Sequence, residues 1–448
     1  MLKRIFNKAV LAAVFLAAGA NASAQSGEYL SYSPYTIYGV GDLAVQGTPY
    51  TRSMGGVGIA SRNVRYINTL NPAAVTARDT LSVMMDFSLT NSNIIYSQLS
   101  GGNKQISARN ITNIGSMAMS FPVWRNLAMM IGATPYSGGG YTFTSKETNP
   151  VVIANNGNIN YYHYGQGALY KLYGAAGYSF WKKLSVGAEA DYVFGNFSKS
   201  FTESFVKTGY NAGKDVYDMK MSTFTGKFGL QYEQKFGTRV KMGLGATYQL
   251  ASEFRGTVDY SHLAAGSSDN LAISSSRDTL GKGNAGAGLA DELGVGLSLN
   301  IDDKLRAEVN YTRSDWTRSR FDTAPGFSDA DSKLPFVSNV RQSIRGGVEY
   351  TPDRYNIRYY TRRISYRAGA YWNNEYYKVA GNEINSFGIT LGATLPIPNQ
   401  YNLYQGLSVA LDFGQRGTVT NTLVRERYVK LCIGVNLHDI WFRKMRYE

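Results

Sequence analysis

Apolar and polar residues alternate one by one along several long stretches of the chain. In residues 240–250 every even position is apolar or aromatic, and the odd positions hold Lys241, Thr247, Gln249 and two glycines. A similar split recurs in residues 81–89, 184–194, 305–311, 387–395 and 429–437. Because successive side chains of a β-strand point to opposite faces, this pattern predicts strands with one apolar face and one polar face.

The length of these stretches favours a transmembrane barrel over the alternative, a soluble all-β protein. Each runs for about nine to eleven residues, the length that a tilted strand needs to cross a bilayer. Fourteen such stretches start near residues 81, 111, 126, 167, 184, 219, 239, 291, 304, 340, 364, 385, 406 and 427. Short connections follow the second, fourth, sixth and eighth stretches, and long polar ones, including 144–166, 196–218, 251–289 and 313–339, follow the odd-numbered ones. This asymmetry is typical of outer-membrane proteins, so we expect an all-β fold in which residues 79–448 form a transmembrane antiparallel β-barrel of about 14 strands.

The composition agrees with a barrel of this kind. The chain has 34 tyrosines and 48 glycines, and only 17% of its residues are charged. No apolar run reaches the ~20 residues that a transmembrane helix needs. An aromatic girdle is expected at the two membrane surfaces, and all five tryptophans lie at or just beyond the ends of the alternating stretches: Trp124, Trp181, Trp316, Trp372 and Trp441.

The first residues indicate that the protein is exported. Lys3, Arg4 and Lys8 precede the apolar run "AVLAAVFLAAGA" and the small-residue end "ASA", so residues 1–24 have the pattern of a cleaved signal peptide. We therefore expect a multi-pass barrel in the outer membrane of a Gram-negative cell, in contact with outer-membrane lipids and lipopolysaccharide. That location excludes nucleic acid as a partner, in spite of the net charge of +14.

Residues 25–78 lack the long alternation and are rich in glycine. They do not have the pattern of a wall strand, so they either hang in the periplasm or fold inside the barrel. Side chains alone do not fill the lumen of a fourteen-stranded barrel, which favours an amino-terminal hatch, or plug, inside it. The expected organisation is a signal peptide (1–24), a hatch (25–78) and a barrel (79–448).

Several short motifs resemble the FadL/TodX family of outer-membrane transporters for hydrophobic compounds. They are "RSMGGVGIA" and "NPAAV" in residues 52–75, "ATPYSGG" from residue 133, "LSVGAEADYVFG" from residue 184, and residues 289–316. The resemblance spans most of the mature chain and implies a hatch motif of Gly55, Gly56, Asn71, Pro72 and Ala73. The opening "YGVGDL" and the basic end "WFRKMRYE" resemble the Bacteroidota branch. That branch includes transporters as well as barrels that are subunits of the type 9 secretion translocon or the barrel-assembly complex.

The sequence "ATPYSGGGY" (133–141) interrupts the third predicted strand. Proline has no backbone N–H to donate, and glycine takes backbone angles that other residues avoid. The resemblance implies that this strand kinks and opens a lateral gate in the wall, built from Gly132, Pro135, Tyr136, Gly138, Gly139 and Gly140. We expect backbone pairing to be interrupted near 133–140, and Val or Thr at Pro135 and the three glycines to extend the ladder and close the hole. The alternative is that these residues only begin the loop 144–166.

Charged residues on the inward phase of the strands are expected to face the lumen. They include Glu189, Asp191, Lys241, Arg306, Glu308, Arg345 and Lys430. These side chains either brace the hatch against the wall through hydrogen-bonded pairs or line a solvated lumen.

A second basic group lies in residues 351–363, a connection that is long for the periplasmic side. It consists of Arg354, Arg358, Arg362 and Arg363. This patch either docks anionic head groups or an acidic partner, or is an ordinary soluble turn.

The sequence contains no recognisable catalytic chemistry. Its three histidines, His163, His262 and His438, have no metal-ligating neighbour at useful spacing. We expect no enzymatic activity, no cofactor and no metal. The first functional hypothesis is a channel that passes a hydrophobic small molecule beside the hatch and out through the lateral gate. The second is a structural subunit that holds partners in an outer-membrane complex.

Overall fold

The computed structural model describes residues 29–78, 81–100, 102–181, 183–207, 212–265, 272–281, 286–327, 336–397, 405–421 and 423–440. The predicted signal peptide and the basic carboxyl terminus, with Trp441, lie outside the described residues. Helices in the described part of the chain are all too short or too polar to cross a membrane.

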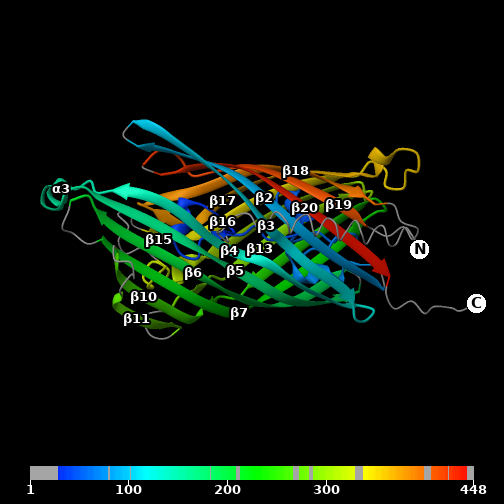
Figure 1. Ribbon diagram of the computed structural model, residues 1–448. Helices are drawn as coiled ribbons and strands as arrows, with labels where there is room; N and C mark the ends of the chain where they lie inside the picture. Colours follow the sequence, from blue (N-terminus) through cyan, green and yellow to red (C-terminus); the bar gives the residue numbers. More distant parts are fainter. Residues whose placement is uncertain are drawn as a thin grey trace, which may run out of the picture.

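A closed antiparallel barrel forms the body of the protein (Figure 1). Within the described residues its wall has fourteen strands: β2 (Ser82–Ser100), β3 (Asn103–Pro122), β4 (Leu127–Lys146), β5 (Ile159–Phe180), β6 (Leu184–Phe205), β7 (Ala212–Phe236), β8 (Val240–Gln249), β13 (Glu292–Ile301), β14 (Leu305–Asp315), β16 (Val340–Tyr350), β17 (Ser365–Val379), β18 (Asn382–Pro396), β19 (Gly406–Arg416) and β20 (Arg425–Ile440). The last strand pairs with the first, from Ser82 opposite Ile440 to Ser97 opposite Arg425, and this pairing closes the wall. The predicted fold class and strand number are confirmed.

Shorter elements lie in the amino-terminal segment and in the connections. The amino-terminal segment contains η1 (Pro34–Ile37), β1 (Asp42–Leu43), α2 (Pro49–Arg52) and η2 (Pro72–Thr76). The connections contain α3 (Pro150–Asn156), β9 (Ser252–Glu253), β10 (Arg255–Ala265), β11 (Ala272–Leu280), β12 (Gly288–Leu289), η4 (Trp316–Arg318), β15 (Phe336–Ser338) and η5 (Tyr360–Arg363).

Several strands are much longer than the alternating pattern predicts. Strands β5 and β6 have 22 residues each and β7 has 25, so much of the predicted loops 144–166 and 196–218 is strand. Strands β10 and β11 continue the sheet beside β7, within the predicted loop 251–289. Beyond the bilayer the outer face of a strand no longer needs apolar residues, while the backbone ladder continues. The apolar alternation therefore ends where a strand leaves the bilayer, although the strand itself continues.

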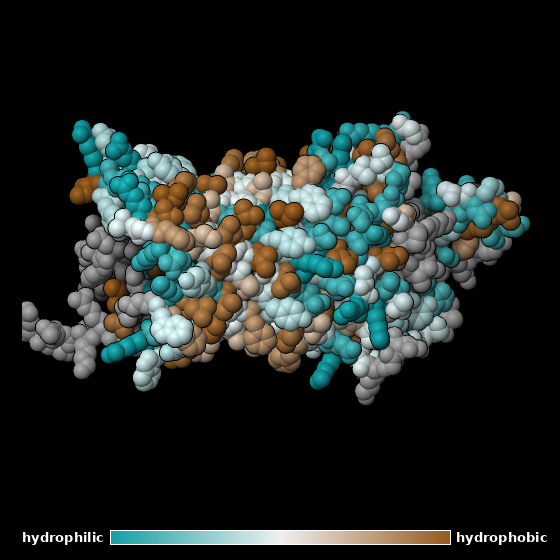
Figure 2. Space-filling view, turned by 180° about the vertical axis from the view of Figure 1, so that it is seen from behind, coloured by the Kyte–Doolittle hydropathy of each residue, from teal (hydrophilic) through white to brown (hydrophobic). Residues whose placement is uncertain are grey.

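The two faces of the wall differ as predicted. Leu244 and Val309 on the outer phase are 48% and 56% exposed, whereas Glu189 and Arg306 on the inner phase are buried. On the face that Figure 2 shows, apolar side chains are most frequent over the middle of the wall and hydrophilic ones towards both ends. One tryptophan departs from the expected girdle, because Trp316 is buried and its ring lies 4.8 Å from that of Tyr376.

Replacing Leu244 by Arg tests the assignment of the outer face. Leu244 lies in the middle of β8 between Tyr232 of β7 and Leu297 of β13, which are also exposed. A charge at this depth should lower the free energy of unfolding in phospholipid vesicles by about 2–4 kcal/mol. The inner-phase control Lys241→Arg should leave it unchanged, and equal losses in the two variants would contradict the assignment.

Residues 29–78 lie inside the barrel, where Figure 1 draws them in blue. The backbone N–H of Ala60 donates to Glu308 Oε1 at 2.9 Å, and Arg306 Nη1 donates to the Tyr50 hydroxyl at 3.0 Å. Arg345 Nη1 donates to the carbonyl of Gly55 at 3.2 Å. Side chains of the inner wall therefore bind the segment directly.

Candidate functional site at a gap in the wall

Strands β3 and β4 have 20 residues each but pair with one another over only six of them. They pair from Pro122 opposite Ala128 to Met117 opposite Ala133. Before Met117 the described residues of β3 pair with β2 alone. After Ala133 strand β4 continues to pair with β5 as far as Lys146. The pairing of β4 with β5 is irregular between Pro135 and Ser137. The predicted interruption is therefore present, on the side of β4 that faces β3.

The amino-terminal segment occupies the edge of β4 that β3 leaves. Strand β1 pairs with this edge, with Asp42 opposite Gly138. The N–H of Ser33 donates to the carbonyl of Gly140 at 2.8 Å, and the N–H of Gly140 donates to Thr36 Oγ1 at 3.1 Å. Edge groups of β4 that would otherwise be unpaired are thus satisfied by residues of the amino-terminal segment.

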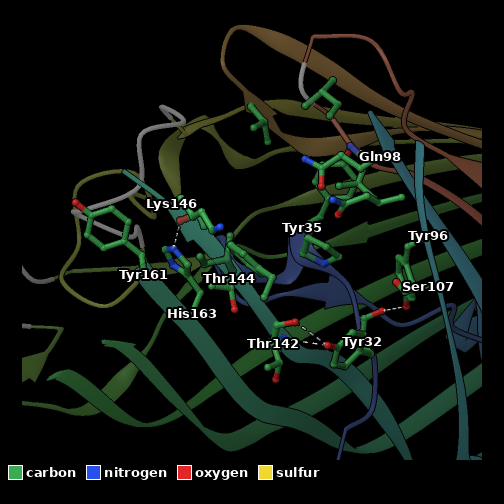
Figure 3. A pocket seen from close by; sticks show the side chains of 18 of the residues that line it. Tyr32, Tyr35, Tyr96, Gln98, Ser107, Thr142, Thr144, Lys146, Tyr161 and His163 are labelled. Carbon is green, nitrogen blue, oxygen red and sulfur yellow. Dashed lines mark hydrogen bonds between the residues drawn. The ribbon is translucent and has the colours of Figure 1, made fainter. Parts of the chain in front are cut away.

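The same segment also reaches β2 and β3, across the gap. Asn113 of β3 donates to the carbonyl of Leu30 at 2.7 Å. The hydroxyl of Tyr32 donates to the carbonyl of Thr142 on β4 at 3.0 Å, and Tyr96 of β2 donates to the carbonyl of Tyr32. Figure 3 shows Tyr32 between Thr142 on one side and Tyr96 on the other. Residues 29–33 therefore fill the space between the separated strands.

The three glycines of β4 serve close packing and not unusual backbone angles. None of them has a positive φ, so the expectation about forbidden angles is wrong. A Cβ at Gly138 would lie 2.5 Å from Leu30 Cβ, and one at Gly140 would lie 2.3 Å from Tyr29 Cδ1. A Cβ at Gly139 would lie 2.7 Å from the ring of Phe197. A larger residue at Gly138 or Gly140 would push the amino-terminal segment away from the strand, and one at Gly139 would strike Phe197 of β6.

Gly140→Val should therefore open the gap, the reverse of the closure expected from the sequence. Displacement of Tyr29 should make a Leu30→Cys thiol react several times faster with a membrane-impermeant maleimide, in a Cys432→Ser background. Gly174→Val on β5 is the matched control, because a Cβ at Gly174 meets no atom within 4 Å. Unchanged labelling in Gly140→Val would contradict the packing argument.

A buried ionic cluster fastens the segment to β19 and β20, on the side of the gap away from β4. Arg416 of β19 contacts Asp42 Oδ1 through Nη1 at 2.5 Å and donates from Nε to Glu426 Oε2 at 2.8 Å. The hydroxyl of Ser33 donates to the other oxygen of Glu426. Arg416 and Glu426 are buried, so little water competes with these contacts. No local pattern in the sequence predicts this cluster.

Tyr35 adds a neutral contact beside that cluster. Burial, followed by the nearby carboxylate of Glu426, raises the pKa of Tyr35 above its ordinary value. The phenol thus keeps its proton and donates to the carbonyl of Val424 at 2.7 Å, while the N–H of Val424 donates back at 3.0 Å.

A cavity of about 700 Å³ lies directly above the filled gap. Its lining includes Tyr32 and Tyr35 of the amino-terminal segment, Ser107 of β3, and Thr144 of β4 (Figure 3). His163 adds an imidazole that stacks on Phe143 and tilts against Phe201. The cavity has aromatic walls and touches both separated strands, so it has the size and surface for a small apolar molecule.

The predicted hatch motif lies against the inner wall. Gly55 and Gly56 have positive φ values of +74° and +80°, and side chains there would strike β16 or Arg345. Asn71 caps η2 by accepting from the N–H of Ala73 at 2.9 Å. Helix η2 rests on Gly187, where a Cβ would lie 2.4 Å from the N–H nitrogen of Ala73.

The predicted lumen-facing charges fall into separate groups. Glu189 and Asp191 contact Lys171, which the sequence analysis missed, at 3.0 and 3.6 Å. Lys241 pairs with Asp303 at 3.0 Å, near a short turn. Lys430 and Arg345 line a small internal cavity of about 50 Å³ together with Asp412. The remaining members, Arg306 and Glu308, bind the amino-terminal segment as described above.

The fold and the site define the class of protein. A barrel with an apolar outer wall, a polar lumen and an amino-terminal segment folded inside it has the architecture of outer-membrane channels with an internal plug. A family model described as BamG matches residues 1–448, so the chain belongs to the BamG family.

Solved structures with the same fold include a hydrocarbon channel, a toluene transporter and a FadL homologue. The CymD monoaromatic hydrocarbon channel is 15% identical with a TM-score of 0.57, and the match covers 88% of this chain and 97% of that one. The toluene transporter TodX of P. putida is 14% identical with a TM-score of 0.57, covering 90% and 100%. A FadL homologue of Pseudomonas aeruginosa is 12% identical with a TM-score of 0.56, covering 89% and 99%. None of the curated proteins matches the sequence.

Proposed function

We propose that this protein is a structural subunit of an outer-membrane complex, the barrel-assembly machinery, and that its lateral channel path is closed. Membership of the BamG family supports this proposal, together with the resemblance to a branch that includes subunits of the barrel-assembly complex. The fold is shared with hydrocarbon channels, but the same barrel can serve as a channel or as a structural subunit.

The closed gap carries the proposal. In a lateral channel the opening between the separated strands must connect the internal cavity to lipid. Here residues 29–33 fill that opening, and Asp42 and Ser33 are held by Arg416 and Glu426. A wall sealed in this way keeps its barrel shape and offers its outer surfaces and its two ends to partners.

Passage of a small apolar molecule is the second candidate. The aromatic cavity of about 700 Å³ favours it, as do the structural neighbours, whose titles describe a hydrocarbon channel and a toluene transporter. In this case residues 29–33 act as a movable seal, and Gly132, Pro135, Tyr136 and the three glycines keep the predicted role of a lateral gate.

Purification from the native outer membrane in mild detergent separates the two candidates. The subunit proposal expects a fixed set of outer-membrane and periplasmic proteins at constant stoichiometry, including the other assembly factors. It also expects deletion of the gene to lower the amounts of many barrel proteins. A chain that purifies alone, combined with loss of uptake of one apolar compound on deletion, would contradict the subunit proposal and favour the channel.

Two earlier expectations remain predictions. One is the Bacteroidota origin, which rests on "YGVGDL" and on a basic terminus outside the described residues. The other is the type 9 translocon as the host complex, which predicts different co-purifying proteins from those of the assembly machinery.

A further inference from the structure

The periplasmic connection between β16 and β17 is a folded loop. The N–H of Asp353 donates to the carbonyl of Arg362 at 2.9 Å, which closes the loop on itself. The N–H of Tyr359 donates to Asn356 Oδ1 at 2.7 Å, and the hydroxyl of Tyr360 donates to the carbonyl of Pro396 at 3.0 Å. These bonds fix the backbone, so a partner would meet a preformed surface and bind at a smaller cost in entropy.

This loop exposes large apolar side chains at its tip. Ile357 is 97% exposed and Tyr355 is 75% exposed. Residues 357–362 are all exposed, and Figure 1 shows the gold loop with its short coil extending beyond the end of the barrel wall. The tip therefore stands away from the apolar belt. An exposed isoleucine on a fixed loop is typical of an interaction site.

The charge of the loop is strongly one-sided. It carries Arg354, Arg358, Arg362 and Arg363 against a single acid, Asp353. Among the described residues none of these arginines forms an ion pair with an acidic side chain. Arg358 and Arg362 are also exposed, so their charges are available to a partner.

Tyrosine rings hold these arginines in place. The guanidinium carbons of Arg358 and Arg362 lie 5.2 and 5.3 Å from the ring centre of Tyr359, and that of Arg363 lies 5.0 Å from the ring centre of Tyr360. Stacking fixes each guanidinium and leaves its N–H groups free for carboxylates. Tyrosine and arginine are also the residues that dominate binding energy at protein interfaces.

The surrounding surface has a net charge of the same sign. Basic residues outnumber acidic ones around the short turns at this end of the barrel: Arg125, Lys183, Lys235, Arg239 and Lys304, against Asp302 and Asp303, which pair with Arg239 and Lys241. The loop thus stands at the edge of a broadly basic end of the molecule.

We propose that residues 351–363 dock onto an acidic face of a periplasmic partner protein, with Ile357 and Tyr355 as apolar anchors and Arg358 and Arg362 as carboxylate ligands. The proposal rests on the subunit function and adds the surface and the partner chemistry. A protein is favoured over anionic head groups, because the anchors stand away from the apolar belt and the arginines are held by rings instead of reaching towards a bilayer.

Photo-crosslinking in intact cells tests this surface. A benzoylphenylalanine in place of Ile357 should link to one periplasmic member of the stoichiometric complex, at a segment rich in Asp and Glu. The double variant Arg358→Glu, Arg362→Glu should weaken this link at least about tenfold. Lysines in the linked acidic segment should restore it. The same crosslinker at Phe236, exposed in another turn at this end, is the matched control and should not give this product.

The outcomes separate this inference from the proposed function. Crosslinks to phospholipid alone, or a full link in the double glutamate variant, would overturn the docking proposal. A complex that stays intact while Ile357 gives no protein link would overturn it as well and leave the subunit function standing. A chain without any stoichiometric partner would contradict both.

Discussion

Replacing residues 29–33 by a flexible glycine–serine segment of equal length should let a small apolar dye cross the outer membrane several times faster. N-phenyl-1-naphthylamine fluoresces on entering lipid, so its rate of fluorescence increase in intact cells measures this passage. The expected cause is the loss of three hydrogen bonds. They join Leu30 to Asn113, Tyr32 to Thr142, and Ser33 to Gly140. The cavity of about 700 Å³ would then connect to the gap between β3 and β4.

Helix α3 provides the matched control for this replacement. It lies in an outer connection and has no buried residue, so the same glycine–serine segment in residues 151–155 should leave dye entry unchanged. Keeping residues 25–28 in both variants leaves the region after the predicted cleavage site intact. Equal dye entry in the two variants and in the wild type would show that residues 29–33 do not seal the gap.

Arg416→Ala should give the largest loss of stability among the single substitutions. It leaves the carboxylates of Asp42 and Glu426 close together without their shared cation. Removing one partner from a buried ionic group costs about 3–5 kcal/mol, because the remaining charge stays buried and uncompensated. Urea unfolding in vesicles measures this loss.

An exposed ion pair serves as the control for Arg416. Arg277 contacts Asp259 at 2.5 Å, as close as Arg416 to Asp42, but its side chain is 72% exposed. Solvent screens such a pair, so Arg277→Ala should cause no measurable loss. A loss in Arg416→Ala no greater than that in Arg277→Ala would contradict the role of the buried cluster.

The wall could be predicted from the sequence because lipid imposes a strict pattern on it. Leu244 and Val309 must face outwards, and Glu189 and Arg306 inwards, so the alternation reveals both strand number and orientation. The same argument fails above the bilayer, where β5, β6 and β7 continue with mixed outer faces. The girdle position expected for Trp316 was wrong for a similar reason. A tryptophan at a strand end can face the membrane surface or be buried under a folded loop, and the sequence pattern is the same in both cases.

The filling of the gap could not be predicted from local patterns. Asp42 and Arg416 are 374 residues apart, and neither lies in a motif that suggests the other. The triple glycine did indicate an unusual strand, but a glycine required by a kink and a glycine required by a close neighbour look alike in a sequence. The neighbour here is the chain's own amino-terminal segment, and its contact between Thr36 and Gly140 joins residues 104 positions apart.

The alternation of apolar and polar residues in the wall also does not distinguish a channel from a structural subunit. Both uses need the same lipid-facing and lumen-facing residues, so alternation carries no information about them. The discriminating features are the contacts of residues 29–33 and the fixed loop 351–363, and both depend on tertiary structure.

A photo-crosslinking residue in place of Leu30, activated in intact outer membranes, tests the closed gap most directly. Leu30 lies beside Gly138 of β4 and accepts a hydrogen bond from Asn113 of β3. A closed gap predicts links within the chain, to peptides that contain residues 109–113 or 138–142. Links to lipid or to other proteins, without links to these two peptides, would contradict it.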